Sequence, residues 1–267
     1  MTVLTAYVDG IGCWAPGLPD WPAVAGWLRG ERAADAAAAA RPQPTMLPAG
    51  ERRRAPLSVL IAVEAAAQAV AMSGHAAADL PAVFASVQGD ATIMDRMCQT
   101  LADAPLELSP TQFHNSVHNA AAGYWTIASG CHAASSAVAA YEHSVAAGLL
   151  EALVQCLSQQ APQLLVASDV PASGPLAEVL VCRQPFASAW VLSPRRGASS
   201  LARLALELGP DAAESQPDHP AAAELAQNNA SARALVLLEA LARGGSPGLQ
   251  LRAADRCGLN LRVEALS

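Results

Sequence analysis

The stretch Ser109–Ala152 reads SPTQFHNSVHNAAAGYWTIASGCHAASSAVAAYEHSVAAGLLEA, and it decides the fold. Within it, residues 133–141 (AASSAVAAY) form a short run of small, mostly apolar residues that predicts a buried strand. Helices are expected before and after this run, over residues 120–129 and 143–154, with a turn-rich segment from Phe113 onward. A strand placed between two helices is typical of a layered α/β fold.

The rest of the chain continues this alternation. A strongly apolar helix is expected over 57–72, another over 91–101 with Asp90 as its N-cap, and a long one over 221–243. Residues 249–253 and 259–265 alternate apolar and polar side chains and predict a closing hairpin. Further strands are expected over residues 7–11, 81–88, 163–169, 176–182, 187–191 and 202–208. Residues 33–48 are expected to form a surface excursion and residues 211–220 a polar loop.

Composition excludes several classes of protein. The chain has 267 residues, 52% hydrophobic and 15% charged, so extensive disorder is not expected. Its net charge of −7 disfavours nucleic-acid binding, and the Arg52–Arg54 run is expected to be a solvated helix end. The six cysteines form no CxxC pair, which excludes a zinc ribbon. With no secretory signal and no membrane-spanning run, we expect a cytoplasmic protein.

Familiar catalytic motifs are absent: the sequence has no GxSxG, Walker A, GxGxxG or HExxH phrase. His114 and His118 could share a metal on a helix, whereas on an extended segment they would be about 13 Å apart. The flanking Phe113, Asn115 and Ser116 do not favour a helix. We therefore expect structural histidines and no metal site.

The order of residues in Ser109–Ala152 resembles the N-terminal half of β-ketoacyl-acyl-carrier-protein synthases, of the thiolase-like superfamily. Those enzymes carry S-P-x-x-F, then N-x-x-A-G-x-x-[ST]-I, a glycine-rich turn, a small-residue strand, T-A-C-x-S and a helix. The matching residues are Ser109, Pro110, Phe113, Asn119, Ala122, Gly123, Thr126, Ile127, Gly130, Gly148, Glu151 and Ala152. The resemblance covers about residues 5–210 and implies one thiolase-like α/β domain over 1–267. Its N-terminal half (core 1–210) would be complete, and its C-terminal part (211–267) truncated to a helix plus a hairpin.

The departures from the family pattern bear on function. Counted from Asn119, the nucleophilic cysteine of the synthases falls on Glu142, and a carboxylate cannot form the acyl thioester. The H-G-T-G-T and N-x-x-x-G-H phrases are absent, and His219 is the only histidine beyond residue 143. The chain thus resembles a chain-length factor, a non-catalytic subunit that forms a heterodimer with an active ketosynthase and shapes the acyl tunnel.

The short form and the Ser116–Asn119 phrase resemble the subunit of aryl-polyene and xanthomonadin-type pathways. The resemblance implies no cofactor, because substrates arrive as phosphopantetheine thioesters on the acyl carrier protein. Typical carrier proteins are acidic like this chain, so we expect only indirect contact with them.

The resemblance also implies roles for individual residues. In thiolase-like dimers the strand before the nucleophile pairs across the two-fold axis, which here gives an interface of Ser135, Ser136, Ala137, Val138, Ala139, Ala140, Tyr141 and Glu142. The candidates for closing the acyl tunnel are Met94, Met97, Cys98, Phe113 and Tyr124. The alternative for the interface residues is an ordinary buried strand within a monomer. The alternative for the tunnel residues is plain core packing.

Three readings of Glu142 remain open. It could cap the following helix or form a salt bridge to the partner, since a carboxylate is favourable at a helix N-terminus. It could instead promote decarboxylation of malonyl-carrier protein, although an anion repels the developing negative charge. The chain could also be a free-standing homodimeric module that binds acyl chains.

Cys131 and His132 are neighbours that point to opposite faces of a strand, so Cys131 is expected to be structural.

Overall fold

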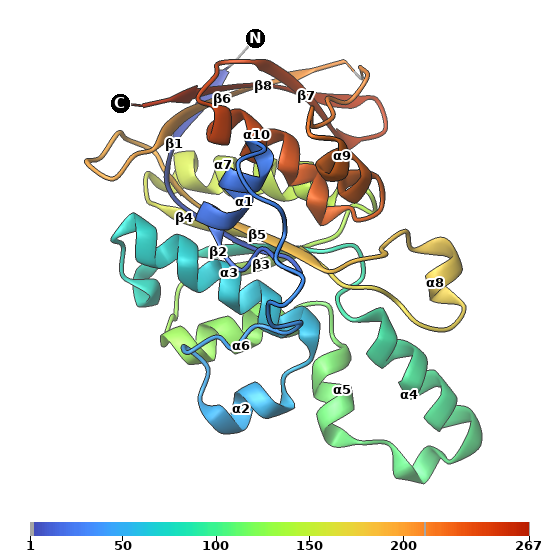
Figure 1. Ribbon diagram of the computed structural model, residues 1–267. Helices are drawn as coiled ribbons and strands as arrows, with labels where there is room; N and C mark the ends of the chain where they lie inside the picture. Colours follow the sequence, from blue (N-terminus) through green and yellow to red (C-terminus); the bar gives the residue numbers. More distant parts are fainter. Residues whose placement is uncertain (1–2, 211, 267) are drawn as a thin grey trace.

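One mixed sheet forms the frame of the protein (Figure 1). The computed structural model describes residues 3–210 and 212–266, and among them eight strands follow the order β3-β2-β4-β5-β1-β6-β8-β7. β2 runs parallel to β3 and β4, and the other neighbours are antiparallel. The strands are β1 (Val3–Trp14), β2 (Ala82–Ala85), β3 (Ser135–Val138), β4 (Gln163–Asp169), β5 (Phe186–Ser193), β6 (Ala202–Gly209), β7 (Gly248–Ala254) and β8 (Cys257–Ala265).

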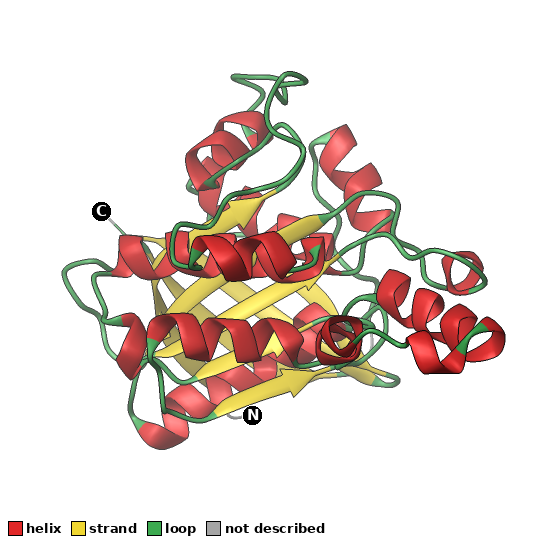
Figure 2. Ribbon diagram, turned by 90° about the horizontal axis from the view of Figure 1, so that it is seen from below, coloured by secondary structure: helices red, strands yellow, loops and turns green. Residues whose placement is uncertain are grey.

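Helices lie on both sides of this sheet (Figure 2). α3 (Leu57–Ser73) and α6 (Ala120–Ser129) bury one core with β2, β4 and β5. α1 (Trp21–Leu28), α7 (Ser144–Gln159), α9 (Pro220–Gln227) and α10 (Leu235–Arg243) bury a second core on the opposite face. The remaining helices are α2 (Ala49–Arg54), α4 (Ala91–Asp103), α5 (Pro110–Ser116), α8 (Leu176–Val179), and the 3-10 turns η1 (Ala77–Asp79), η2 (Pro105–Glu107) and η3 (Ser231–Ala234). Of the described helices, none is long and apolar enough to cross a membrane.

The middle of the sheet has an internal symmetry. Read outward from the β1–β6 pair, β5 and β4 on one side correspond to β8 and β7 on the other. α7 precedes the β4–β5 pair as α10 precedes the β7–β8 pair. β1 is followed by α3, β2 and α6, whereas β6 is followed by α9 with no other described helix or strand between them. The C-terminal half is therefore truncated by loss of the counterparts of α3, β2 and β3.

The truncation makes β7 an outer strand, and a neighbouring segment covers its backbone. The N–H of Ser215 donates to the Gln250 carbonyl at 2.9 Å, and the Gln250 N–H donates to Ser215 Oγ at 2.9 Å. The Arg252 N–H donates to Glu214 Oε1 at 2.9 Å. Residues 214–215 thus occupy the side of β7 that another strand would otherwise approach.

Two glycines of β1 allow α3 to lie directly on the strand. A Cβ atom added to Gly12 would stand 1.9 Å from the Ala65 carbonyl oxygen, and one added to Gly10 would stand 2.0 Å from that of Ala69. A β-bulge between Val8 and Gly10 sets the register that turns both glycines toward α3. The close approach explains why the sequence has glycine at positions where a strand interior normally favours larger residues.

Most expected elements are present. The helix expected over 57–72 is α3, and the one over 91–101 is α4, whose N-cap Asp90 accepts from the Ile93 N–H at 3.0 Å. The closing hairpin is β7–β8. Residues 30–48 contain neither helix nor strand, as expected for a surface excursion.

Three expectations about helices and strands were wrong in this part of the comparison, and those for residues 133–142 are described with the site. Residues 176–182 form α8 and an irregular tail instead of a strand, and most of them are exposed, outside the sheet. The long helix over 221–243 is broken into α9, η3 and α10, because Asn229 binds backbone carbonyls of Asp169 and Gln184. The segment around His114 is helical, since Ser109 caps α5 by accepting from the Gln112 N–H and Pro110 fits its first turn.

Candidate functional site

Glu142, which counting along the motif predicts at the nucleophile position, lies on a pocket of about 110 Å³. The pocket opens where the parallel strands β2, β3 and β4 end, an edge at which α/β sheets commonly bind ligands. Its walls are largely apolar. They consist of Val87, Gln88, Gly89, Ala91, Tyr141, Glu142, Asp169, Val170, Leu180, Val181, Cys182, Ala226, Gln227, Ala230 and Arg233.

A strained turn presents Glu142 to this pocket. Tyr141, the residue before it, has a φ of 50°, a left-handed conformation that non-glycine residues seldom adopt. Ser144 holds the turn, because its Oγ donates to the Tyr141 carbonyl at 2.7 Å and accepts from the Ala140 N–H at 3.0 Å. The Tyr141 hydroxyl also donates to the Val179 carbonyl at 2.7 Å and so ties the turn to α8.

An ion pair within the same chain neutralises the Glu142 carboxylate. Arg233 of η3 donates to Glu142 Oε2 at 2.5 Å and forms a second, short ion pair with Glu214. Each ring nitrogen of His143 lies 3.9 Å from a carboxylate oxygen, one of Glu142 and one of Glu214. Glu142 therefore does not cap α7, which begins at Ser144 with His143 at the N-cap position. The charge-assisted hydrogen bond from Arg233 thus occupies one oxygen of the Glu142 carboxylate.

Cys182 is the one thiol among the pocket residues. Burial raises the pKa of the Cys182 thiol to about 12, and the charge of the nearby Asp169 raises it further. Two hydrogen bonds act in the opposite direction, one from the Asn229 amide to Cys182 Sγ and one from Cys182 Sγ to the Gln184 carbonyl. Burial also raises the pKa of the Asp169 carboxyl, against hydrogen bonds from Ser231, Val87 and Ser86. A thiol with so high a pKa is protonated at neutral pH and does not act as a nucleophile.

This arrangement predicts the order in which the thiols react. With iodoacetamide at pH 8, Cys98 is expected to be alkylated first, because it is exposed. Cys13, Cys156 and Cys182 are expected to react at least tenfold more slowly, since burial raises the pKa of each. Peptide mass spectrometry over a time course measures the order, with the urea-unfolded chain as the control in which all six react alike. Early labelling of Cys182 in the folded protein would contradict the assignment.

The histidines have separate surroundings. His114 of α5 packs edge-on against Tyr124, with ring centroids 5.7 Å apart, whereas His118 Nε2 lies 3.0 Å from the Ser86 carbonyl oxygen. His219 begins α9 and packs against Trp27 at 4.6 Å. Within residues 3–210 and 212–266, no group of three or more His, Cys, Asp or Glu side chains could hold a metal ion.

The tunnel candidates lie outside this pocket. Met94, Met97 and Cys98 lie on α4; Met97 is buried, Met94 half-buried and Cys98 exposed. Phe113 on α5 is 59% exposed, whereas Tyr124 on α6 is buried and donates to Asn115 Oδ1 at 3.1 Å. α4 and α5 project from the body of the molecule (Figure 1). The role of these five residues in a tunnel stays a prediction.

The interface candidates lie at a free edge of the sheet. Among the strands that the structure describes, β3 pairs with β2 alone, with Ser135 opposite Ala82. Ser135 and Ala137 are exposed, so β3 is not the buried strand that its composition suggested. The strand is also shorter than expected, because Ala139, Ala140 and Tyr141 belong to the turn before α7.

Comparison with known proteins agrees with this geometry. Residues 25–253 match a family model described as beta-ketoacyl synthase, N-terminal domain. No curated protein matches the chain in sequence. A ketosynthase in complex with its chain length factor from Xenorhabdus doucetiae is similar, with a TM-score of 0.72 and 24% identity over 97% of this chain and 99% of that chain.

Two further structures show how much of the fold is present. A type II polyketide synthase acyl-carrier protein in complex with its ketosynthase gives a TM-score of 0.75 at 13% identity, over 99% of this chain and 100% of that one. The ketosynthase from module 1 of the bacillaene synthase of Bacillus amyloliquefaciens gives a TM-score of 0.57 at 14% sequence identity. That match covers 79% of this chain and 47% of the bacillaene synthase chain. Because the family model matches most of the length of this chain, the chain belongs to the beta-ketoacyl synthase N-terminal domain family.

Proposed function

We propose that this chain is a non-catalytic chain-length factor that forms a heterodimer with an active ketosynthase and shapes its acyl tunnel. The observation that supports the proposal is that Arg233 binds the carboxylate of Glu142, the residue that motif counting places at the nucleophile position. The partner would supply the cysteine and both histidines that this sequence lacks. The two chains together would extend polyene, polyketide or fatty-acid-like products.

The size of the chain supports the same proposal. It aligns with 99% of a chain from a ketosynthase–chain length factor complex, but with 47% of a modular ketosynthase chain. Short chains with this fold therefore occur in complexes of that kind. The aryl-polyene and xanthomonadin-type pathways remain our proposal for the biological setting, together with a cytoplasmic location.

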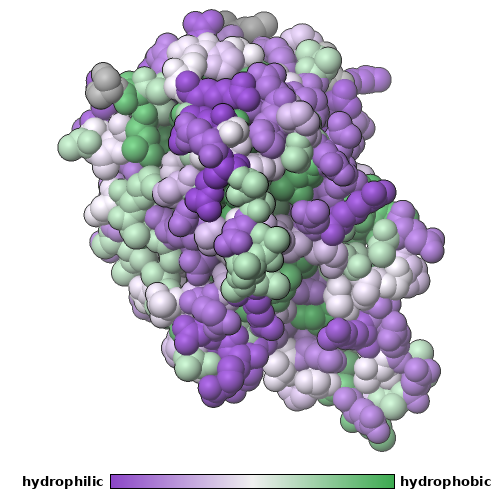
Figure 3. All heavy atoms as spheres, in the orientation of Figure 1, coloured by the Kyte–Doolittle hydropathy of each residue, from purple (hydrophilic) through white to green (hydrophobic). Residues whose placement is uncertain are grey.

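The free edge of the sheet is the surface that we propose for the partner. Ser135–Val138 has small side chains, which allow a second backbone to approach closely and pair with the unsatisfied groups of the strand. α6 borders this strand and leaves Ile127 78% exposed. On the side seen in Figure 3, apolar and polar side chains are interspersed.

The substrates would be phosphopantetheine thioesters on an acyl carrier protein, with no cofactor held by this chain. Met94, Met97, Cys98, Phe113 and Tyr124 are proposed to bound the far end of the tunnel. Their mixed exposure is consistent with a wall that is completed by the partner.

Co-expression tests the proposal. The tagged chain is purified together with the ketosynthase encoded nearest to it, and the complex is weighed by light scattering. A one-to-one heterodimer that makes product, while neither chain does so alone, is the expected result. A stable homodimer that ignores the ketosynthase would overturn it in favour of a free-standing acyl-binding module.

Replacing Glu142 with alanine separates this function from a decarboxylase. We expect product formation by the heterodimer to stay within twofold of wild type, because Glu142 takes no part in the reaction. The free energy of unfolding should fall by less than about 1 kcal/mol, since the Glu142 side chain is 47% exposed. Formation of acetyl-carrier protein from malonyl-carrier protein is the readout. Activity that is present in the wild type and lost in Glu142→Ala would establish a decarboxylase.

A further inference from the structure

The sheet bends around α7, and both of its outer strands come close to this helix. α7 contacts β2, β3 and β4 in one half of the sheet and β7 in the other. Figure 1 shows α7 between the upper strands β6, β8 and β7 and the lower strands β2, β4 and β5. The segment that covers β7 therefore reaches the N-terminus of α7, where Glu142 precedes the helix.

Three side chains join this cover over β7 to the turn after β3. The Arg252 N–H of β7 donates to Glu214 Oε1 at 2.9 Å, and Glu214 Oε2 binds Arg233. Arg233 donates from its other terminal nitrogen to Glu142 Oε2 at 2.5 Å. We call Glu214, Arg233 and Glu142 the charge bridge. It links segments that adjoin β3 and β7, the two ends of the strand order.

Glu214 is the member of the charge bridge that acts in both directions. One oxygen of its carboxylate accepts from the backbone of β7, and the other binds Arg233. The Glu214 and Arg233 side chains are 16% and 22% exposed, against 47% for Glu142. A charge-assisted hydrogen bond that is shielded from water is strong, and loss of one partner leaves the other charge uncompensated. Loss of Glu214 would therefore release Arg233 from the better shielded of its two carboxylates.

His143 lies between the same two carboxylates but does not join them. Among the described residues its buried Nδ1 has no hydrogen-bond partner, and it lies 3.9 Å from Glu214 Oε1. Arg233 is therefore the side chain through which Glu214 acts on the turn. β3 ends at Val138, and residues 139–143 lead from it to α7, so the position of this turn sets how β3 presents its free backbone groups.

We propose that Glu214 is a positioning residue for the heterodimer. Acting through Arg233, it fixes the turn after β3 and so couples the cover over β7 to the edge that meets the ketosynthase. The identity of the partner rests on the proposed function. Because coupling between two sites is reciprocal, binding of the ketosynthase would also hold the cover more tightly on β7. Glu142 then serves as the outer end of the charge bridge and takes no part in chemistry.

A double-mutant cycle tests the coupling. Isothermal calorimetry measures the Kd for the ketosynthase in wild type, Glu142→Ala, Glu214→Ala and the double variant. We expect each single variant to raise the Kd at least fivefold, with product formation at saturating ketosynthase unchanged. Adding Glu214→Ala to Glu142→Ala should change the Kd less than twofold further, because the charge bridge is already broken. An unchanged Kd in Glu214→Ala, or additive effects of the two substitutions, would overturn the proposal.

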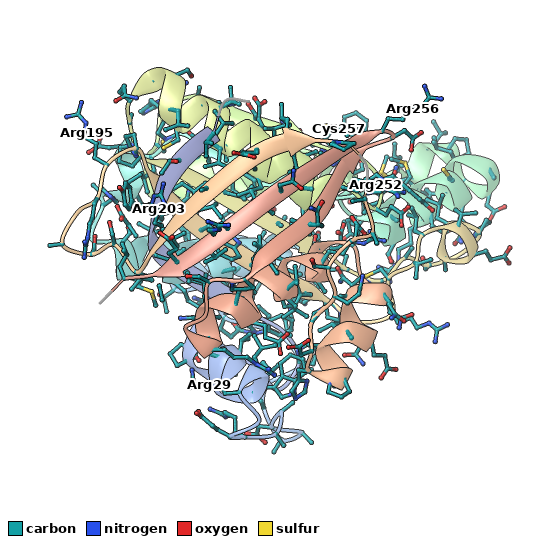
Figure 4. All side chains as sticks on the ribbon, turned by 90° about the horizontal axis from the view of Figure 1, so that it is seen from above. Arg29, Arg195, Arg203, Arg252, Arg256 and Cys257 are labelled. Carbon is teal, nitrogen blue, oxygen red and sulfur yellow. The ribbon has the colours of Figure 1, made fainter. Side chains whose placement is uncertain are left out.

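Glu264→Ala is the matched control for these titrations. Glu264 pairs with Arg203 at 3.1 Å, and Figure 4 shows Arg203 and Arg252 toward opposite ends of the β6, β8 and β7 part of the sheet. Removal of this ion pair should leave the Kd for the ketosynthase within twofold of wild type. A rise equal to that of Glu214→Ala would mean that any lost ion pair weakens the complex, which contradicts a specific role for Glu214.

Hydrogen exchange gives a readout that does not need the ketosynthase. In the free chain, exchange at the Arg252 amide is expected to be at least thirtyfold faster in Glu214→Ala and about threefold faster in Glu142→Ala. Glu214→Gln keeps an oxygen for the Arg252 N–H but loses the charge that binds Arg233, so it should match Glu142→Ala in exchange and in Kd. This variant also replaces Glu214→Ala if that chain fails to fold.

The two readouts separate this proposal from the proposed function. If Glu142→Ala leaves exchange at Arg252 unchanged, the turn and the cover are not coupled and this proposal is wrong, even where the heterodimer forms. If wild type forms no heterodimer, the proposed function is wrong, and with it the role of Glu214 toward the ketosynthase.

Discussion

A Ser135→Glu/Ala137→Glu variant is expected to lose co-purification with the ketosynthase, with at least a hundredfold rise in the dissociation constant. Both positions are exposed on β3, at the edge where backbone pairing with the partner would occur. Two carboxylates there would have to be desolvated between the chains, and charges of this kind are how natural edge strands resist pairing. Light scattering of the mixed chains measures the loss.

The same variant should remain folded. Neither side chain contributes to the core, so the free energy of unfolding is expected to change by less than about 0.5 kcal/mol. Ala221→Glu, an exposed substitution on α9, is the matched control and should leave the heterodimer intact. A heterodimer of unchanged affinity in the double variant would show that the chains meet at another surface.

Gly12→Ala is expected to destabilise the fold by about 3 kcal/mol or more. The added methyl group would stand 1.9 Å from the Ala65 carbonyl oxygen and 2.8 Å from the Ala69 nitrogen, both backbone atoms of α3. Relief requires α3 to move off β1, which would open the core under the helix. Urea unfolding followed by circular dichroism measures the loss.

Gly50→Ala serves as the control for that measurement. Gly50 lies in α2 with no atom within 4 Å of an added Cβ. Alanine has the better helix propensity, so this variant should be more stable by about 0.5–1 kcal/mol. If both variants lose stability equally, the close packing of α3 on β1 is not what the glycine provides.

Sequence patterns correctly predicted the helices whose apolar spacing and caps lie within a short stretch of the chain. α3 follows from a long apolar run, and α4 from its period and the Asp90 cap. The segment 176–182 has the apolar composition of a strand, yet it follows Gly174 and Pro175 and finds no neighbour in the sheet. The amino-acid composition of this segment does not indicate whether the sheet has a strand with which it could pair.

The contacts that shape the site join distant parts of the chain. Glu142 and Arg233 are 91 residues apart, and Asn229 breaks the long C-terminal helix by bonding to Asp169 and Gln184, 60 and 45 residues away. Counting along the motif placed Glu142 at the nucleophile position. Nothing within that motif indicates that an arginine from the truncated half would bind the carboxylate.

The cover that residues 214–215 form over β7 has a consequence for stoichiometry. A sheet with two bare ends joins copies head to tail without limit and forms fibres. Here one end is closed by the chain itself, and β3 at the other end stays bare. Strand pairing with other chains is therefore restricted to β3, and under the proposed function we expect the truncated subunit to form pairs and not polymers.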